Sequence, residues 1–163
     1  MFSAGGAPMN DLSDLLSVSA IDADLSVTNK KSLFQQLAAG AAKLTGLPAK
    51  EILACINERE RLGSTGFGGG IAIPHGKIEG VSAIVGYFVR LATPLEFNAI
   101  DKMPVDLVFL LLSPPNAGAD HLKALARVSR TLRDRATLAK LRGARSEDAI
   151  FALLSGVETA HAA

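Results

Sequence analysis

The segment GSTGFGGGIAIPHG, residues 63–76, presents a lone histidine in a setting suited to group transfer. Six of its fourteen residues are glycine, and His75 is its only ionisable side chain. An imidazole titrates at about pH 6.5, so much of it is unprotonated at neutral pH and can accept a phosphoryl group on a ring nitrogen. Glycine lets backbone N–H groups approach an anion closely, and each hydrogen bond to a charged group contributes about 1.5–3 kcal/mol. These residues suit phosphoryl transfer to His75.

Several polar side chains near His75 in the sequence could complete a phosphoryl site. Arg59 or Arg61, together with Ser64, Thr65 and a second histidine, would supply hydrogen-bond donors. Each also has an ordinary structural interpretation. The two arginines suit the solvated end of a helix, and the two hydroxyl side chains can bond within their own turn. Glycine runs are usually simple bends, and a histidine after proline is often a surface residue.

Other kinds of site do not match the sequence. The glycine run has no lysine where a phosphate-binding loop needs one, and it lacks the dinucleotide-binding glycine spacing. The three histidines, His75, His121 and His161, have no metal-binding spacing, and Ser64 lies in no nucleophile elbow. We therefore expect neither a metal nor a cofactor.

Two amphipathic helices are predicted before the glycine-rich segment. The first begins at Thr28 or Asn29 as N-cap and stops at Gly46. The second starts at Pro48 and ends before Gly63, which brings the two arginines to the edge of the glycine-rich segment. The residues expected to face the core are Leu33, Phe34, Leu37, Ala41 and Leu44 in the first helix, and Ile52, Leu53 and Ile56 in the second.

A sheet is predicted after the glycines. GIAIP, residues 70–74, suits a short strand, and residues 82–91 and 105–113 suit two longer ones. The apolar run from Leu107 to Leu112 is typical of a central strand covered on both faces.

Three helices are expected in the last third of the chain. The longest covers residues 119–134 and is predicted to bury a face of Leu122, Leu125, Ser129 and Leu132. Two shorter ones follow, the last of them opened by Ser146. The predicted fold class is α/β, a single domain with a mixed sheet of about five strands flanked by helices on both faces.

Length, composition and charge limit the kinds of protein that this chain can form. The chain has 163 residues, 48% hydrophobic and 20% charged, with a net charge of +1, which favours one globular domain without strong global attraction to nucleic acid. Lys123 to Arg145 holds eight basic residues and one acid, Asp134, so docking of nucleic acid or an acidic protein there is an alternative. A solvated helix face is the simpler explanation, because no aromatic residues interleave the basic ones.

The remaining sequence features favour a cytoplasmic location. The sole cysteine, Cys55, lies within the second helical pattern and is expected to be a buried structural thiol. No signal peptide or run of about 20 apolar residues is present, so we expect a cytoplasmic protein without membrane insertion. Residues 1–8 are predicted to be a flexible tail, 9–156 the domain and 157–163 a C-terminal tail.

Several separated motifs together resemble a known family. NERERLGSTGFGGGIAIPHGK, followed by PLEFNAIDKMPVDLVFLLLSPPNAGADHLKALARVSRTLRD, is similar to fructose/mannitol-type IIA proteins of the bacterial phosphotransferase system, and most closely to their nitrogen-regulatory branch. The resemblance implies that His75 carries a phosphoryl group received from an HPr-like phosphocarrier protein. It also implies that Arg59 and His121 bind the phosphoryl oxygens or tune the nucleophile, and it leaves Asp101 structural.

The resemblance leaves two possible uses of the phosphorylated protein, one in regulation and one in sugar transport. The regulatory branch would report its phosphorylation state to protein partners that control nitrogen metabolism or potassium homeostasis. The alternative is a sugar-specific IIA component that passes the group to a IIB protein. Either is a phosphotransferase of the carrier type, in which the protein itself is phosphorylated and dephosphorylated.

Overall fold

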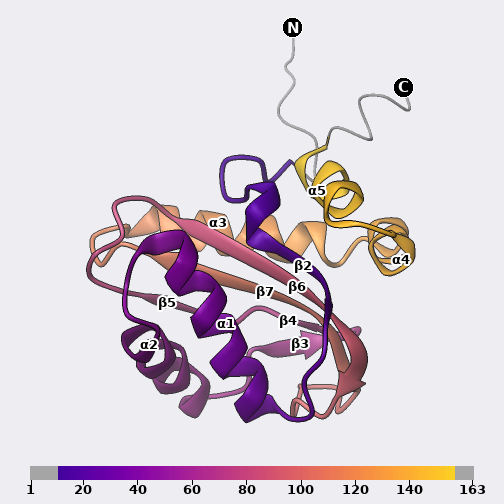
Figure 1. Ribbon diagram of the computed structural model, residues 1–163, viewed down its shortest axis with the longest axis horizontal. Helices are drawn as coiled ribbons and strands as arrows, with labels where there is room; N and C mark the ends of the chain where they lie inside the picture. The colour runs from indigo at the N-terminus through magenta and orange to yellow at the C-terminus, as the bar shows by residue number, and fades with distance from the viewer. Residues whose placement is uncertain (1–10, 157–163) are drawn as a thin grey trace, which may run out of the picture.

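A six-stranded mixed β-sheet runs through the structure (Figure 1). The computed structural model describes residues 11–156, so both predicted tails and residues 9 and 10 lie outside the described part of the chain. The described elements are η1 (Val18–Ala20), β2 (Ile21–Leu25), α1 (Lys30–Thr45), α2 (Ala49–Arg61), β3 (Gly66–Gly68), β4 (Ile71–Ala72), β5 (His75–Lys77), β6 (Val85–Leu95), β7 (Val105–Ser113), α3 (Ala119–Thr131), α4 (Arg135–Gly143) and α5 (Glu147–Ser155).

The sheet has the order β2-β6-β7-β4-β3, and β5 also pairs with β7. β6 is antiparallel to β7, whereas β4 and β5 run parallel to it. The predicted mixed α/β sheet is confirmed, but it has six strands rather than about five. β3 and β5 were not predicted from the sequence, because both are short and contain glycine. β2, with the sequence IDADL, alternates apolar and acidic residues and could have been located.

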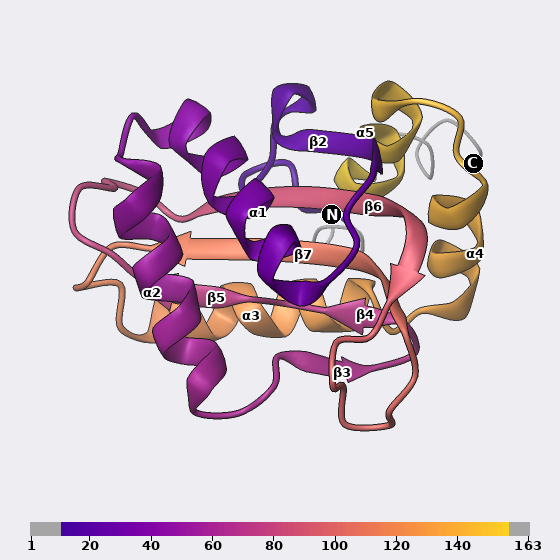
Figure 2. The same cartoon turned by 60° about the horizontal axis from the view of Figure 1, so that its bottom comes forward.

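β7 is the central strand that its apolar run predicted. Every residue from Val105 to Ser113 is buried except Asp106, which is half-buried. Figure 2 shows why: α1 and α2 lie in front of the sheet, and α3 lies behind it. Burial on both faces explains why the strand is nearly continuous in apolar residues instead of alternating.

The two helices before the glycine-rich segment form where their end signals predict. Asn29 caps α1 by accepting a hydrogen bond from the backbone N–H of Ser32 at 2.8 Å, and Gly46 ends the helix in the left-handed conformation at φ 78°. Pro48 is the N-cap of α2 rather than its first helical residue, because its ψ of 133° is extended. α2 ends at Arg61, so its last turn carries the arginines into the glycine-rich segment.

The predicted buried face of α3 is only partly correct: Leu132 is fully buried and Leu125 packs against the core, but Leu122 is not buried. Leu122 is 68% exposed, whereas His121 beside it is buried, together with Ala124 and Val128. Leu122 and His121 both fit a helical spacing, and the larger apolar side chain suggested Leu122 as the buried one. α3 contacts β7, and the His121 side chain reaches Ser113 at the end of that strand.

The sheet brings two distant histidines to one edge. His75 opens β5 and pairs with Leu111, near the C-terminal end of β7. β7 ends at Ser113, and α3 begins at Ala119, so the first turn of α3 lies close to the same edge. None of the helices in residues 11–156 is long and apolar enough to cross a membrane.

Candidate active site

His75 is held in one orientation by its own backbone segment. β4 leads through Pro74 into His75, whose Nδ1 lies 2.9 Å from the carbonyl oxygen of Ile73. A carbonyl oxygen can only accept a hydrogen bond, so Nδ1 carries the proton when it makes this contact. The neutral ring then has its lone pair on Nε2. His75 is half-buried, and this nitrogen is the one available as a nucleophile.

Arg59 contacts that nitrogen directly. Its Nε–H donates to Nε2 of His75 at 3.2 Å, and its Nη1 donates to the carbonyl oxygen of Gly63 at 2.8 Å. The guanidinium is therefore held between the nucleophile and the start of the glycine-rich turn. The sequence prediction for Arg59 placed it beside His75, and the structure brings the two together.

His121 lies beside His75. It comes from α3, on the face of the sheet opposite to α2, which carries Arg59. The two ring centroids are 5.6 Å apart and the rings are tilted by 51°. His121 is buried, and its Nδ1 lies 2.6 Å from Oγ of Ser113, the last residue of β7. Because that contact occupies Nδ1, Nε2 is the His121 nitrogen left for a ligand or a second proton.

The surroundings of His75 keep its ring neutral near pH 7. Burial is the main cause that lowers its pKa below the usual 6.5, and the charge of Arg59 acts in the same direction. The hydrogen bond to Ile73 and the charge of Glu60 act in the opposite direction but do not outweigh them. A lowered pKa keeps the Nε2 lone pair available for attack.

The pKa of His121 is lowered as well. Burial is again the main cause, followed by the charges of His75 and Lys77. The two rings therefore disfavour simultaneous protonation, and both are expected to be neutral in the unphosphorylated protein.

The two histidines line an open hollow of about 490 Å³. Its other lining residues are Cys55, Glu58, Arg59, Leu62, Gly76 and Lys77. Leu62 is 83% exposed, and Lys77 adds a cation that the sequence analysis did not assign to the site. Lys77 could have been noted from its place two residues after His75. Ser113 gave no comparable signal, because a serine at a strand end is common.

The remaining predicted site residues do not contact His75. Ser64 Oγ accepts the backbone N–H of Gly66 at 3.1 Å, as in a local turn. Thr65 is buried and bonds to Glu60 through both its N–H and its hydroxyl. Arg61 donates to Glu58 at 2.7 Å on the exposed side of α2. Of the sequence-predicted set, the structure thus brings together His75, Arg59 and His121.

Of two other predicted features, Cys55 differs from expectation and Asp101 does not. Cys55 is half-buried rather than fully buried, and it lies in the wall of the hollow with its Sγ 3.4 Å from the carbonyl oxygen of Lys77. Burial raises the pKa of its thiol. Asp101 accepts the backbone N–H groups of Gly69 and Met103 at 3.0 Å each, in keeping with a structural role.

The basic segment from Lys123 to Arg145 is partly neutralised by acids from elsewhere in the fold. Arg127 forms an ion pair with Asp14 at 2.6 Å, and Arg142 forms one with Asp106 at 2.8 Å. These contacts tie α3 and α4 to the rest of the domain. They give two of the eight cations a structural explanation and leave less of the segment for a nucleic acid.

The sequence matches a protein-family model along most of its length. Residues 14–157 match the family described as "Phosphoenolpyruvate-dependent sugar phosphotransferase system, EIIA 2". The chain belongs to this family. The phosphoryl-carrier chemistry that the histidine and its surroundings suggested is the chemistry of IIA components, and the predicted family is confirmed.

Individual relatives identify the branch that this IIA component resembles. The nitrogen regulatory protein of Bradyrhizobium diazoefficiens is 49% identical over 144 residues, covering 88% of this chain and 94% of the relative. That of Escherichia coli K12 is 41% identical over 131 residues, 80% of each chain. The crystal structure of nitrogen regulatory protein IIA-Ntr from Neisseria meningitidis superposes with a TM-score of 0.83 at 35% identity, over 86% of this chain and 97% of that one. The predicted similarity to nitrogen-regulatory IIA proteins is confirmed.

Proposed function

We propose that Nε2 of His75 accepts a phosphoryl group from the phosphohistidine of an HPr-like carrier. The observation that carries this assignment is the pair of contacts on the ring: the Ile73 carbonyl binds Nδ1, and Arg59 donates to Nε2. The first contact selects the nucleophilic nitrogen, and the second places a cation where negative charge will arrive.

The transfer is written as an in-line exchange between two imidazoles. The Nε2 lone pair of His75 attacks phosphorus, the bond from phosphorus to the carrier's ring nitrogen breaks, and its electron pair returns to that ring. The proton on Nδ1 of His75 stays on that nitrogen throughout, hydrogen-bonded to the Ile73 carbonyl oxygen. Because the carrier already holds an activated phosphoryl group, the receiving site has mainly to position and neutralise it.

Arg59 has two successive contacts in this scheme. Its Nε–H hydrogen-bonds the same lone pair that must attack phosphorus, at 3.2 Å. The guanidinium must therefore leave Nε2 as the phosphoryl group arrives, and it can then donate to the phosphoryl oxygens. The bond to the Gly63 carbonyl keeps it nearby during that exchange.

The other groups around the hollow suit the dianionic product. Nε2 of His121 and the ammonium group of Lys77 can donate to phosphoryl oxygens. Protonation of His121, which the charge of neighbouring His75 now disfavours, becomes favourable once a phosphoryl group of about −1.5 to −2 charge is bound nearby. Ser64 and Thr65 contribute through the turn they form.

We further propose that the phosphorylation state of His75 is a regulatory signal, read by protein partners concerned with nitrogen metabolism or potassium homeostasis. The support is the name shared by the relatives, nitrogen regulatory protein, at 49% and 41% identity. Rapid transfer to a sugar-specific IIB protein, coupled to uptake of one sugar, would favour the transport alternative instead.

The deciding experiment is intact-mass spectrometry at neutral pH. The protein is incubated with phosphoenolpyruvate, enzyme I and an HPr-like carrier, beside His75→Ala. We expect one acid-labile phosphoryl group on the wild type and none on the variant. Full phosphorylation of His75→Ala would refute the site, and no phosphorylation of the wild type by carriers active on another acceptor would refute the carrier function.

A further inference from the structure

A buried carboxylate next to Arg59 has no role in the scheme above. The side chain of Glu60 is only 9% exposed, yet it receives three donors. Its Oε1 accepts the hydroxyl of Thr65 at 2.6 Å, and its Oε2 accepts the backbone N–H of Thr65 at 3.0 Å and the ammonium group of Lys30 at 2.7 Å. A buried carboxylate is costly unless it is paired in this way, so the three contacts depend on one another.

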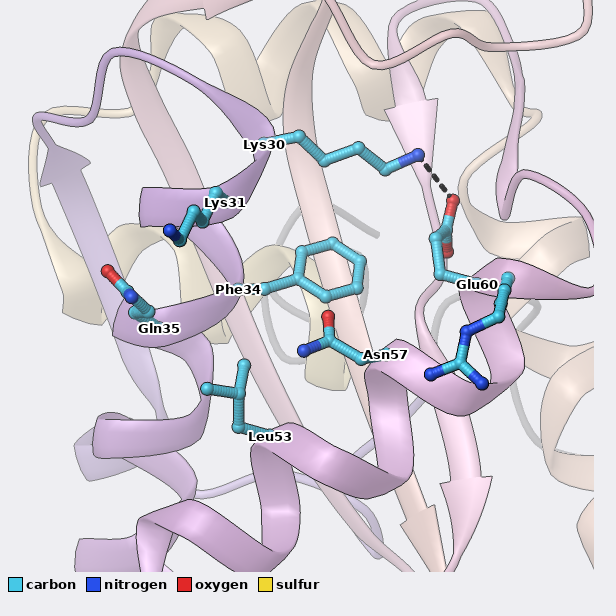
Figure 3. Close-up of a pocket in the computed structure, with 8 residues that line it drawn as sticks. Lys30, Lys31, Phe34, Gln35, Leu53, Asn57 and Glu60 are labelled. Carbon is cyan, nitrogen blue, oxygen red and sulfur yellow. Dashed lines mark ion pairs between the residues drawn. The ribbon is translucent and has the colours of Figure 1, made fainter.

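The contacts of Glu60 join separate segments of the fold. Figure 3 shows Lys30 reaching across from α1 to Glu60 on α2. Lys30 also donates to the carbonyl oxygen of Phe97 at 3.0 Å and lies over the Phe97 ring at 4.2 Å. Thr65 lies directly before β3. One carboxylate therefore links α1, the loop after β6 and the glycine-rich turn to the last turn of α2.

The glycine-rich turn, residues 63–65 at the start of the glycine-rich segment, is bound to α2 at two points. Gly63 accepts a hydrogen bond from Nη1 of Arg59, and Thr65 is bound by Glu60, the next residue along α2. Loss of the second attachment would leave Gly63 held to α2 by its own N–H, which donates to the Glu60 backbone carbonyl at 3.1 Å, and would let the Gly63 carbonyl that orients the guanidinium tilt. A small movement of Arg59 would lengthen a contact to Nε2 of His75 that is already 3.2 Å.

We propose that Glu60 is a positioning residue: by binding Thr65 and Lys30 it fixes the glycine-rich turn on α2 and so holds the Arg59 guanidinium at Nε2 of His75. This inference rests on the proposed phosphorylation of His75. It assigns the Thr65 hydroxyl to the support of Arg59 rather than to the phosphoryl group itself.

The first test weakens the attachment without changing any charge, because it removes one of the two Thr65 contacts with Glu60 and leaves the backbone N–H contact in place. Thr65→Val removes the hydroxyl that Glu60 binds, and Thr65→Ser restores it. We expect Thr65→Val to slow phosphorylation of His75 by the HPr-like carrier by about 10- to 100-fold, since small displacements of a positioning group cost that much. Thr65→Ser should recover most of the rate. Glu51→Gln, an exposed carboxylate in the first turn of the same helix, is the control and should leave the rate unchanged.

A second variant approaches the same carboxylate from α1. Lys30→Met removes the ion pair at 2.7 Å and leaves both Thr65 contacts in place. We expect Lys30→Met to slow the phosphorylation of His75 as well, but by a smaller factor than Thr65→Val. Circular dichroism shows whether each variant folds. If Thr65→Val does not fold, Lys30→Met still tests the proposal. Wild-type rates in whichever of the two variants fold would overturn the proposal.

An NMR titration of the His75 ring separates positioning from simple charge effects. The charged or titratable groups near this ring are Cys55, Glu58, Arg59 and Glu60 on α2, His121 on α3 and Lys77 on β5. The charge of Glu60 raises the pKa of His75, and that of Arg59 lowers it. Glu60→Gln acting through charge alone would therefore lower the pKa. Release of Arg59 would raise it instead.

The expected result is a rise in the pKa of His75 in both Glu60→Gln and Thr65→Val. A fall in the first with no change in the second would overturn the proposal, because it would show that Glu60 acts on His75 by its charge. The titration needs no phosphoryl donor, so it is independent of the carrier assay. Phosphorylation of His75→Ala would refute the proposed function, whereas normal phosphorylation of Thr65→Val would refute only the role of Glu60.

Discussion

Replacement of Arg59 by methionine should make His75 more basic and its proposed phosphorylation slower. Arg59→Met removes the hydrogen bond to Nε2 of His75 and the bond to the Gly63 carbonyl while keeping most of the aliphatic side chain. The guanidinium charge is one of the causes that lower the pKa of His75, so that pKa should rise toward 6.5. Burial remains and keeps it below that value.

The rate should fall despite the more basic ring. One hydrogen bond from a charged donor to a phosphoryl oxygen is worth about 1.5–3 kcal/mol. At about 1.4 kcal/mol per factor of ten, its loss slows phosphorylation of His75 by about 10- to 150-fold. Arg61→Met is the matched control, because Arg61 lies two residues away, is 72% exposed and bonds only to Glu58 among the described residues.

Two measurements check this prediction. Rapid-quench sampling with mass spectrometry gives the rate of phosphoryl transfer from the HPr-like carrier, and an NMR titration gives the pKa of the His75 ring. A higher pKa with an unchanged or faster rate would refute the role given to Arg59, since basicity alone would then govern the reaction. An equal loss of rate in Arg61→Met would show that the arginines act through general charge on the carrier.

Three further outcomes follow from the packing and the pKa shifts. Phe109→Ala, at a fully buried position beside Phe88, should lower the free energy of unfolding by about 3–5 kcal/mol in urea denaturation. A Cβ at Gly76 would lie 2.5 Å from Sγ of Cys55, so Gly76→Ala should cost about 1–3 kcal/mol, and less in a Cys55→Ala background. Because the folded-state pKa of His75 lies below 6.5, the unfolded chain binds more protons between the two values. The contribution of this ring to stability should therefore fall as the pH drops below about 6.5, and thermal melts of His75→Gln should show a shallower pH dependence.

Local patterns account for the parts of the fold that were predicted correctly. The ends of α1 depend on Asn29 and Gly46, whose conformational preferences act within a few residues. β7 was located because a strand covered on both faces must be apolar at nearly every position. His75 stood out for the same local reason, as the lone ionisable residue in a glycine-rich segment.

The error in α3 shows where a local pattern stops being informative. Leu122 and His121 both belong to helical series of acceptable spacing, and hydropathy favours the leucine. In the folded protein, however, the buried side of α3 carries His121, Ala124 and Val128. A buried histidine next to an exposed leucine is stable only because Ser113 bonds to its Nδ1.

The sequence by itself singled out His75 as the candidate nucleophile and predicted most of the elements that carry it. Only the tertiary structure decided which ring nitrogen of His75 keeps its lone pair, which arginine contacts that nitrogen and how the glycine-rich turn is held. Arg59 and Arg61 lie on the same helix turn, and their difference arises from the side of α2 that faces β5. His121 meets His75 because the end of β7 brings α3 to the edge where β5 begins. Such contacts join residues far apart in the chain, and the burial that makes them strong exists only after the sheet and its helices have packed.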